Sequence, residues 1–320
     1  MLILQGWAML WVVIGHSPVS LEDMPSFVST MYHFAYSFHM PLFIAISGYL
    51  FQLTKLNKLN GVVGGGNYIG IIKDKLLRLG IPFLVFTFIA MLMKVLFPGD
   101  MARQTSLSIV EFLKAIVNPF EGPLNELWFV GTILWLFAFA PLWQWVGRSG
   151  KTEVVCIVIL LMIHYIDVTT NVLCARQVCA NAIYFYFGIL ICKHGLDTWV
   201  QPKRWLLLLA IPVYAVAVYY NLNMIVTLSA IVFSAGLAFI ADEYCPKLFS
   251  SFRNYTYQIY LIGIFAQIAV KMIYKRVDMP YLFGFVLCIL AGLYVPVIIS
   301  MILEGFNWKP LLLCVGLKKK

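Results

Sequence analysis

The sequence predicts an all-α fold, a polytopic bundle of about ten transmembrane helices, and two observations lead to this prediction. Hydrophobic residues make up 62% of the 320 positions and charged residues only 12%. A soluble domain has about 45–50% apolar and about 25% charged residues, so lipid is the expected solvent for most of this chain. Apolar stretches also recur along its whole length, and about 17 or more such residues cross a hydrocarbon core of about 30 Å as a helix.

Glycine and proline divide the apolar stretches into separate spans, because both residues interrupt helices. The breaks hold Gly61, Gly64, Gly65, Gly66, Pro98, Gly99, Gly147, Gly150, Pro202 and Pro280. The predicted spans are 2–18, 34–53, 76–97, 126–146, 153–168, 180–193, 204–220, 223–241, 255–273 and 281–303. The first span lacks a basic leader and a small-residue cleavage site, so we expect a transmembrane helix rather than a cleaved signal peptide. No stretch remains for a soluble domain, and residues 1–320 are predicted to form a single integral membrane domain.

The distribution of lysine and arginine predicts that both termini are cytoplasmic, because cytoplasmic loops carry an excess of these residues. With this orientation sixteen of them lie inside and seven outside. The inner ones are Lys55, Lys58, Lys73, Lys75, Arg78, Arg148, Lys151, Lys193, Lys203, Arg204, Lys247, Arg253, Lys309, Lys318, Lys319 and Lys320. The outer ones are Lys94, Arg103, Lys114, Arg176, Lys271, Lys275 and Arg276. The last three oppose the assignment, which therefore rests mainly on the first half of the chain.

The net charge of +9 comes from short basic clusters between apolar segments, which indicates membrane orientation rather than nucleic-acid binding. The seven cysteines are scattered, mostly within apolar runs, without the paired spacing of a metal site. We therefore predict no metal and expect most cysteines to be small buried side chains. Cys174 and Cys179 flank a loop predicted to lie outside, where a disulfide is chemically allowed.

Two histidines inside predicted helices are the first candidates for chemistry. His16 lies near the outer end of the first span and His39 near the outer start of the second. At about 1.5 Å per residue both fall in the outer third of the membrane, so one cavity can hold both. Ionisable groups at such depth usually face the bundle interior, and histidine can take and return the proton of a hydroxyl during acyl transfer. The alternative is a structural histidine bonded to a backbone carbonyl.

The segments that surround both histidines carry a recognisable pattern. Residues 5–16 read QGWAMLWVVIGH and residues 38–49 read FHMPLFIAISGY. They resemble the first two helices of the acyltransferase-3 family of membrane acyltransferases, in which a basic residue precedes the first histidine and a Phe-His-Met-Pro-Leu-Phe run with Ser-Gly follows. Weaker similarities occur at residues 78–82, 127–129, 185–188 and 259–262. The resemblance covers almost the whole chain.

Two positions depart from the family pattern. Gln5 stands where the family has a cation, on the same helical face as His16, so it can donate hydrogen bonds but supplies no charge. Gly263 stands where many members place a histidine. The histidine that many members have at this position therefore cannot take part in the reaction of this chain.

The resemblance implies a cytoplasmic acyl-CoA donor, with acetyl the expected acyl group, and a sugar hydroxyl outside. His16 is predicted to act as general base, with His39 orienting it or stabilising the oxyanion, and Gln5 is kept with this group as a hydrogen-bond donor. An acyl-histidine intermediate is the alternative to direct transfer. Lys73, Lys75 and Arg78 are candidates to hold the donor's phosphates, although lysine and arginine also anchor helix ends.

Three further residues are candidates for substrate binding. Trp128 and Glu126 stand at the predicted outer entry of the fourth span, where an aromatic side chain either stacks on a sugar or acyl arm or belongs to the aromatic belt. Ser47 precedes Gly48, and a small residue there also suits helix packing.

The sequence thus predicts a membrane O-acyltransferase of the bacterial cytoplasmic (inner) membrane, with no permanently bound cofactor. Its expected partners are acetyl-CoA or another acyl-CoA, a glycan or lipid-linked sugar and membrane lipid, but no nucleic acid, and a homo-oligomer is left open. A transporter or flippase is the main alternative, because a polytopic bundle with polar groups at depth suits it too. Against it, no internal repeat is evident and the polar groups gather in the first two spans. A catalytically inactive relative is the third reading, supported by the missing cation at Gln5.

Overall fold

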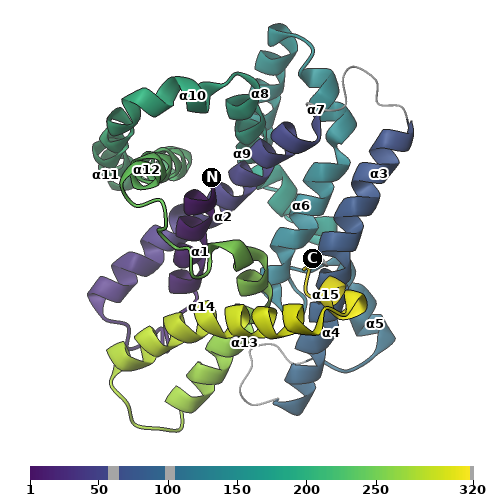
Figure 1. Cartoon of the computed structure of the whole chain (residues 1–320), viewed down its shortest axis with the longest axis vertical. Coiled ribbons are helices and arrows are strands. Elements are labelled where there is room, and N and C mark those ends of the chain that lie inside the picture. The colour runs from purple at the N-terminus through teal and green to yellow at the C-terminus, as the bar shows by residue number, and fades with distance from the viewer. Residues whose placement is uncertain (57–64, 98–104, 318–320) are drawn as a thin grey trace. The chain divides into compact units, whose positions relative to one another are not determined.

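The computed structural model describes residues 1–56, 65–97 and 105–317, and every regular element in them is a helix (Figure 1). The helices group into two compact units. The first contains Met1–Phe43 and Gly195–Trp308, and the second contains Ile44–His194 together with α15 (Lys309–Cys314). The long helix α2 (Ser26–Thr54) contributes its first part to one unit and its second part to the other.

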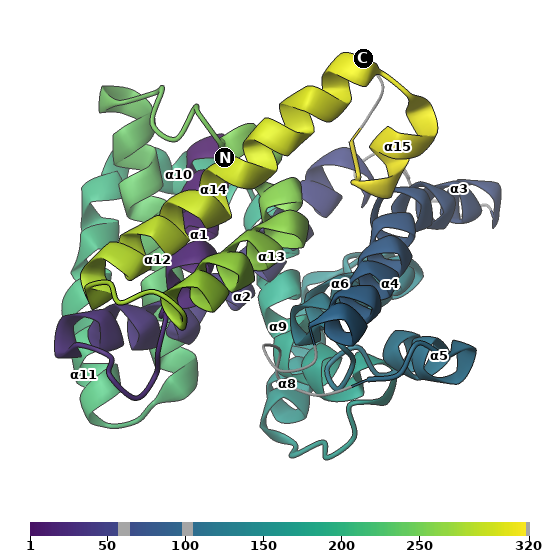
Figure 2. The same cartoon turned by 90° about the horizontal axis from the view of Figure 1, so that it is seen from below.

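The first unit is built around the short helix α1 (Leu2–Gly15), which is apolar on nearly every side. A helix of this kind is stable when neighbours surround it. α1 contacts α12 (Asn223–Tyr244), α13 (Thr256–Tyr274) and α14 (Tyr281–Phe306). α13 and α14 run side by side (Figure 2). The other elements of this unit are α10 (Leu196–Val200), η5 (Gln201–Leu209), α11 (Ala210–Tyr219) and η6 (Arg253–Tyr255).

Packing and interhelical hydrogen bonds hold α1 in place, as expected for helices surrounded by lipid. A buried cluster joins α1 to its neighbours through Met9, Val12, Val13, Phe252, Ile259, Leu293 and Val297. The indole Nε1 of Trp7 donates a hydrogen bond to Ser234 Oγ on α12 at 3.0 Å. These contacts fix the position of the end of α1, where His16 follows.

A proline in α2 creates a hydrogen bond to α12. Pro41 lies inside the helix and has no N–H, so the carbonyl of Ser37, four residues earlier, loses its partner within the helix. The hydroxyl of Thr227 donates to that carbonyl at 2.8 Å. The Met-Pro step after His39 therefore couples the helix that carries the histidine to α12.

A second proline has a similar consequence between α13 and α14. Pro296 leaves the carbonyl of Gly292 without a partner in α14. That oxygen faces α13 so closely that a Cβ built on Gly263 would lie 2.7 Å from it. Any side chain at this position would force the two helices apart. The glycine that departs from the family pattern is thus explained by close packing.

The second unit contains the remaining elements in chain order. They are α3 (Gly65–Lys75), η2 (Leu76–Gly80), α4 (Ile81–Leu96), α5 (Ile109–Val117), η3 (Asn125–Leu127), α6 (Trp128–Ala138), α7 (Ala140–Val146), α8 (Gly150–Tyr165), η4 (Val172–Cys174) and α9 (Ala175–Lys193). The C-terminal helix α15 contacts α4. Within this unit the second half of α2 packs on α9 through two glycines, Gly48 and Gly188, at which the backbones meet directly.

A charged cluster ties α8 to α9 at one end of this unit. Glu153 is only 6% exposed, forms an ion pair with Lys193 and is hydrogen-bonded to His194 Nε2 at 2.9 Å. Lys193 also donates to the carbonyl of Gly147 at 2.6 Å, which ends α7. Lys193 compensates the negative charge of the buried carboxylate, because an unpaired buried ion would be strongly destabilising. The orientation prediction places this end on the cytoplasmic side.

Every predicted span coincides with helical residues, but the described chain does not establish the predicted number. Among residues 1–56, 65–97 and 105–317, seven helices are long and apolar enough to cross a membrane, or eight if the bent pair Asn125–Ala138 and Ala140–Val146 counts as one span. α1 has 14 residues and α8 has 16, so both are shorter than such a span. The all-helical prediction is confirmed for the described residues, whereas ten spans and cytoplasmic termini stay predictions.

Prolines also explain where the helices differ from the predicted boundaries. The third predicted span starts at 76, but its helix begins at Gly65 and continues through a π-helical turn, Leu76–Gly80. Pro82 cannot donate to the carbonyl of Arg78 and crowds it, and a wider turn relieves this conflict. The fourth predicted span bends by 52° before Pro141 for a related reason. α3, α5, α10 and α15 lie outside the predicted spans.

Cysteine labelling tests the predicted orientation. A cysteine in Glu22→Cys is expected to react with a membrane-impermeant maleimide from outside, and one in Lys151→Cys only from inside, since the two positions lie on opposite sides in the lysine and arginine pattern. Both residues are exposed. Peptide-resolved mass spectrometry separates these labels from those on the seven native cysteines. Reaction of both from one side would contradict the orientation.

Candidate active site

The first unit brings His16 and His39 together. Their ring centroids are 6.4 Å apart and the rings are nearly perpendicular. Tyr36 lies against both, with its ring centroid 5.7 Å from that of His16 and 5.1 Å from that of His39. The three residues form what we call the histidine cluster. Tyr36 and His39 are three residues apart on α2, so they share a face of the helix.

His39 is oriented by its own helix. The residue is 2% exposed, and its Nδ1 is hydrogen-bonded to the carbonyl oxygen of Ala35, one turn earlier. A carbonyl only accepts hydrogen bonds, so Nδ1 carries the proton. In the neutral ring the lone pair is then on Nε2. This arrangement fixes both the tautomer and the direction in which the basic nitrogen points.

His16 occupies the end of α1 and has a different environment. It is the C-terminal cap residue of the helix and is partly exposed. Its Nδ1 lies 3.4 Å from the hydroxyl of Tyr36, a long contact in which either group can be the donor. The positive charge of Lys271 on α13 also acts on the ring. A cation on α13 therefore influences the cluster, although the family's cation on the first helix is replaced by Gln5.

A buried amide holds the end of α1 to α13. Gln267 is 2% exposed, and its Nε2 donates to the Val13 carbonyl and to Ser17 Oγ, both at 2.9 Å. Ser17 Oγ in turn donates to the Val13 carbonyl at 2.6 Å. The Val13 carbonyl, in the last turn of α1, also accepts a bond from the backbone N–H of His16 at 3.2 Å. These bonds fix the backbone on both sides of His16.

Gln5 does not belong to the histidine cluster. It is eleven residues before His16 on α1, which corresponds to about 16 Å along the helix axis. It shares the helical face that the sequence predicted, but the distance excludes direct contact with the reacting atoms near His16. A catalytic role for Gln5 stays a prediction.

The family assignment follows from a comparison that covers these elements. A family model described as an acyltransferase domain, Acyl_transf_3, matches residues 3–301. The chain belongs to the acyltransferase-3 family. Neither the curated proteins nor the solved structures gave a match. Together with its apolar helices, this family membership identifies an integral membrane acyltransferase.

The three cations predicted to bind the acyl donor, Lys73, Lys75 and Arg78, all lie in the second unit of the acyltransferase. Their surroundings differ. The ammonium of Lys75 lies 3.8 Å from the ring centroid of Phe137 and 5.8 Å from that of Phe51, so cation–π contacts hold it within the unit. Lys73 and Arg78 are exposed. Arg78 lies on the π-helical turn, ten residues after the first residue of the candidate span Tyr68–Leu96, rather than at the start of the helix.

The predicted substrate-binding residues are also in the second unit of the acyltransferase. Trp128 begins α6, and its carbonyl accepts hydrogen bonds from the Thr132 hydroxyl at 2.9 Å and from Cys174 Sγ. Glu126 lies in the preceding short turn η3. Ser47 adjoins Gly48, where α2 packs on α9. These positions suit packing as well as binding, and a substrate role stays a prediction for each.

Two further predictions concern cysteines and metal. Cys174 and Cys179 are both free, so the disulfide considered for them is not formed. Left-handed backbone at Leu173 and Cys174 directs Cys174 toward α6, where its sulfur contacts the Trp128 carbonyl. Among the described residues no group of three or more histidine, cysteine or acidic side chains is arranged to hold a metal ion.

The sequence predicted that the two histidines lie close together, as they do, but not which residues surround them. Tyr36 had a usable signal, because it precedes His39 by three residues on the same helical face. Lys271 and Gln267 had none, since their role depends on the packing of α13 against α1. Lys271 was assigned only as an outer basic residue.

Proposed function

We propose that this acyltransferase moves an acyl group, with acetyl the expected one, from cytoplasmic acyl-CoA to a hydroxyl of an extracytoplasmic sugar. The observation that carries the proposal is the orientation of His39, whose Nδ1 proton is held by the Ala35 carbonyl beside the ring of His16. A base oriented by a third group is the arrangement that activates a hydroxyl for acyl transfer. A bacterial cytoplasmic membrane is the proposed location.

The geometry favours exchanging the roles that the sequence suggested for the two histidines. Nε2 of His39 takes the proton of the acceptor hydroxyl as its oxygen attacks the thioester carbonyl. The C–S bond then breaks, the ester forms, and the protonated His39 returns its proton to the departing CoA thiolate. An N–H of His16, supported by the charge of Lys271, stabilises the oxyanion that develops on the carbonyl oxygen. No additional reactant is needed.

Donor binding tests the function independently of the acceptor. If Arg78 contacts the phosphates of acyl-CoA, Arg78→Ala is expected to weaken acetyl-CoA binding by about ten- to a hundredfold, since a hydrogen bond to a charged group contributes about 1.5–3 kcal/mol. Arg78→Lys is expected to recover part of the affinity, because it keeps the charge but loses the bidentate guanidinium. The measurement is a calorimetric titration of the purified protein with acetyl-CoA.

A matched control removes an exposed cation from the same predicted face. Lys151→Ala is expected to leave acetyl-CoA affinity unchanged, which separates a specific contact from general loss of positive charge. Absence of saturable acyl-CoA binding by the wild-type protein would overturn the acyltransfer proposal for this chain. Movement of a lipid-linked sugar across vesicles by the same preparation would then favour the transporter reading.

A further inference from the structure

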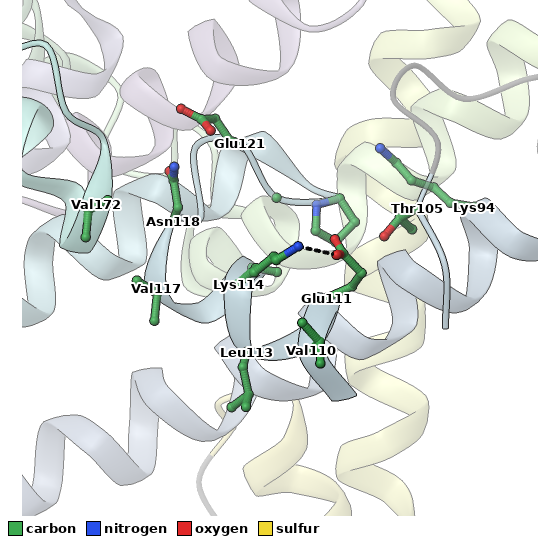
Figure 3. A pocket seen from close by; sticks show the side chains of 13 residues that line it. Lys94, Thr105, Val110, Glu111, Leu113, Lys114, Val117, Asn118, Glu121 and Val172 are labelled. Atoms are coloured by element: carbon green, nitrogen blue, oxygen red, sulfur yellow. Dashed lines mark hydrogen bonds and ion pairs between the residues drawn. The ribbon is translucent and has the colours of Figure 1, made fainter. Parts of the chain in front are cut away.

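We propose that a pocket beside α5 binds the uncharged sugar headgroup of a lipid-anchored acceptor. This inference rests on the proposed function, whose acceptor it assigns to a chemical class. The pocket lies wholly within the second unit and has a volume of about 620 Å³, within the range of about 300–1,000 Å³ that small-molecule sites occupy. Its walls come from the end of α4, from α5, from the loop that follows α5 and from the start of η4 (Figure 3).

The polar groups of the pocket suit hydroxyl groups. Asn118 Oδ1 is buried and has no hydrogen-bond partner among the described residues, so it can accept a bond from a ligand. Lys94, only 6% exposed, contributes an ammonium from another wall. Glu121 stands beside Asn118 (Figure 3). Donor and acceptor side chains arranged around one cavity can together recognise the hydroxyl groups of a sugar.

The charges of the pocket argue for an uncharged headgroup. Among the described residues that line it, Lys94 and Lys114 are balanced by Glu111 and Glu121. Lys114 is already paired with Glu111 at 2.7 Å (Figure 3). A phosphate or an acidic sugar would meet two carboxylates as well as two ammonium groups, and like charges at close range disfavour its binding. A neutral sugar encounters no such repulsion.

The outer face of α5 indicates how the ligand is anchored. Ser108 caps the helix by accepting from the Glu111 N–H, as in a capping box. Four apolar side chains then remain exposed: Ile109 79%, Val110 61%, Leu113 55% and Val117 43%. An amphipathic helix with such a face lies in the membrane interface, with its apolar side toward the acyl chains.

The apolar face of α5 and the pocket adjoin. Val110, Leu113 and Val117 are exposed and also line the cavity. The sequence pattern predicts the segment between the third and fourth spans to lie outside. A headgroup in the pocket would therefore have its lipid chain along α5, at the outer surface of the membrane. This arrangement favours an anchored acceptor over a sugar free in solution.

A protection experiment on the full chain in phosphatidylcholine nanodiscs tests the proposal. The reporter is Val117→Cys, labelled with a membrane-impermeant maleimide and quantified by peptide-resolved mass spectrometry. The probes are the octyl glycosides of glucose, galactose, mannose and N-acetylglucosamine. At a concentration about ten times its dissociation constant, a bound glycoside is expected to slow labelling about tenfold. The corresponding methyl glycosides and octyl phosphate are expected to protect only at much higher concentrations.

Two matched variants make the result specific. Adding Asn118→Leu to the reporter is expected to raise the half-protecting concentration about five- to tenfold, because the change keeps a side chain of similar size and removes the acceptor. Labelling of Glu22→Cys is expected to be unaffected by every probe. Equal protection by octyl phosphate, no protection by any of the four glycosides, or no effect of Asn118→Leu would each overturn the proposal.

Measuring acetyl-CoA binding in the same preparation separates failure of the proposed pocket from failure of the proposed function. If acetyl-CoA binds saturably to the same preparation but the glycosides do not protect the reporter, the acceptor site is wrong and acyl transfer stands. If the glycosides protect and acetyl-CoA does not bind, the pocket is a glycolipid site and the acyltransfer reaction is wrong.

Discussion

His39→Ala is expected to lower the rate of acyl transfer by about 10²- to 10⁴-fold, the range over which general acid–base groups contribute. The proton on Nδ1 is held by the Ala35 carbonyl, so only Nε2 can receive the acceptor proton. Alanine removes that nitrogen. The measurement is transfer of radiolabelled acetyl from acetyl-CoA to membrane glycans by purified protein in proteoliposomes.

Loss of structure must be separated from loss of the base, because His39 is buried. His39→Ala removes the side-chain hydrogen bond to the Ala35 carbonyl, which keeps its backbone partner in α2, so the lost bond costs about 0.5–1.5 kcal/mol. His39→Asn offers an amide N–H near the position of Nδ1 and contains no basic nitrogen, so we expect it to fold like the wild type and still be inactive. His33→Ala, a matched change at an exposed histidine of the same helix, should retain full activity.

Comparison with His16 decides which histidine is the base. Removing one oxyanion donor costs about 10²- to 10³-fold, so His16→Ala is expected to be the milder change. If His16→Ala proves more damaging than His39→Ala, the roles are those first suggested by the sequence. Effects of residues that act together are not additive, and the double variant is expected to be little worse than His39→Ala alone.

Sequence reasoning placed the helices because the physical signal is strong. Each predicted span needed only a long apolar run and a glycine or proline break, and each coincides with helical residues. The predicted helix boundaries were less accurate where a polar helix adjoins an apolar one. α3 has low hydrophobicity and ends in Lys73 and Lys75, so nothing in its composition distinguished it from a loop.

Other local features could have been found from the sequence. α5 begins with Ser108 and has Glu111 three residues later, which is the pattern of a capping box before an apolar run. The prolines at 82 and 141 indicated distortions of their helices. Whether a proline produces a π-helical turn or a sharp bend depends on the surrounding packing, which the sequence pattern does not contain.

The candidate site also contains one part that the sequence predicted and one part that it did not. Depth counted in residues placed His16 and His39 at one level, and their ring centroids are 6.4 Å apart. The contributions of Lys271 and Gln267 come from α13, more than 250 positions later than His16 for each. No periodicity within one helix reveals a pairing between distant helices.

Gly188→Ala is expected to be the most destabilising of the glycine substitutions in the second unit. A Cβ at this position would lie 1.9 Å from the Ala45 carbonyl oxygen and 2.7 Å from the Tyr49 backbone nitrogen. Both atoms belong to the backbone of α2 and cannot rotate away as a side chain can. The helices α2 and α9 must therefore separate and lose the close packing that associates helices in lipid.

The steric overlap between the new Cβ and the backbone of α2 determines whether Gly188→Ala stabilises or destabilises the protein. Alanine is favoured over glycine by about 1 kcal/mol within a helix, which would stabilise α9. Overpacking typically costs about 1–3 kcal/mol and more when the backbone must move, so the net change is expected to be strongly unfavourable. Gly70→Ala provides the control, because a Cβ there meets nothing within 4 Å and alanine gains its helical preference.

Thermal denaturation of Gly188→Ala and Gly70→Ala in the same detergent measures whether each substitution lowers or raises the unfolding midpoint. Gly188→Ala should lower the midpoint by several degrees or prevent accumulation of folded protein, whereas Gly70→Ala should raise the midpoint or leave it unchanged. Gly48→Ala provides a second test of the same interface, since its Cβ would lie 2.0 Å from the Phe185 carbonyl oxygen. Wild-type stability in both Gly188→Ala and Gly48→Ala would show that α2 and α9 do not pack backbone to backbone, because no rearrangement of side chains can accommodate these two methyl groups.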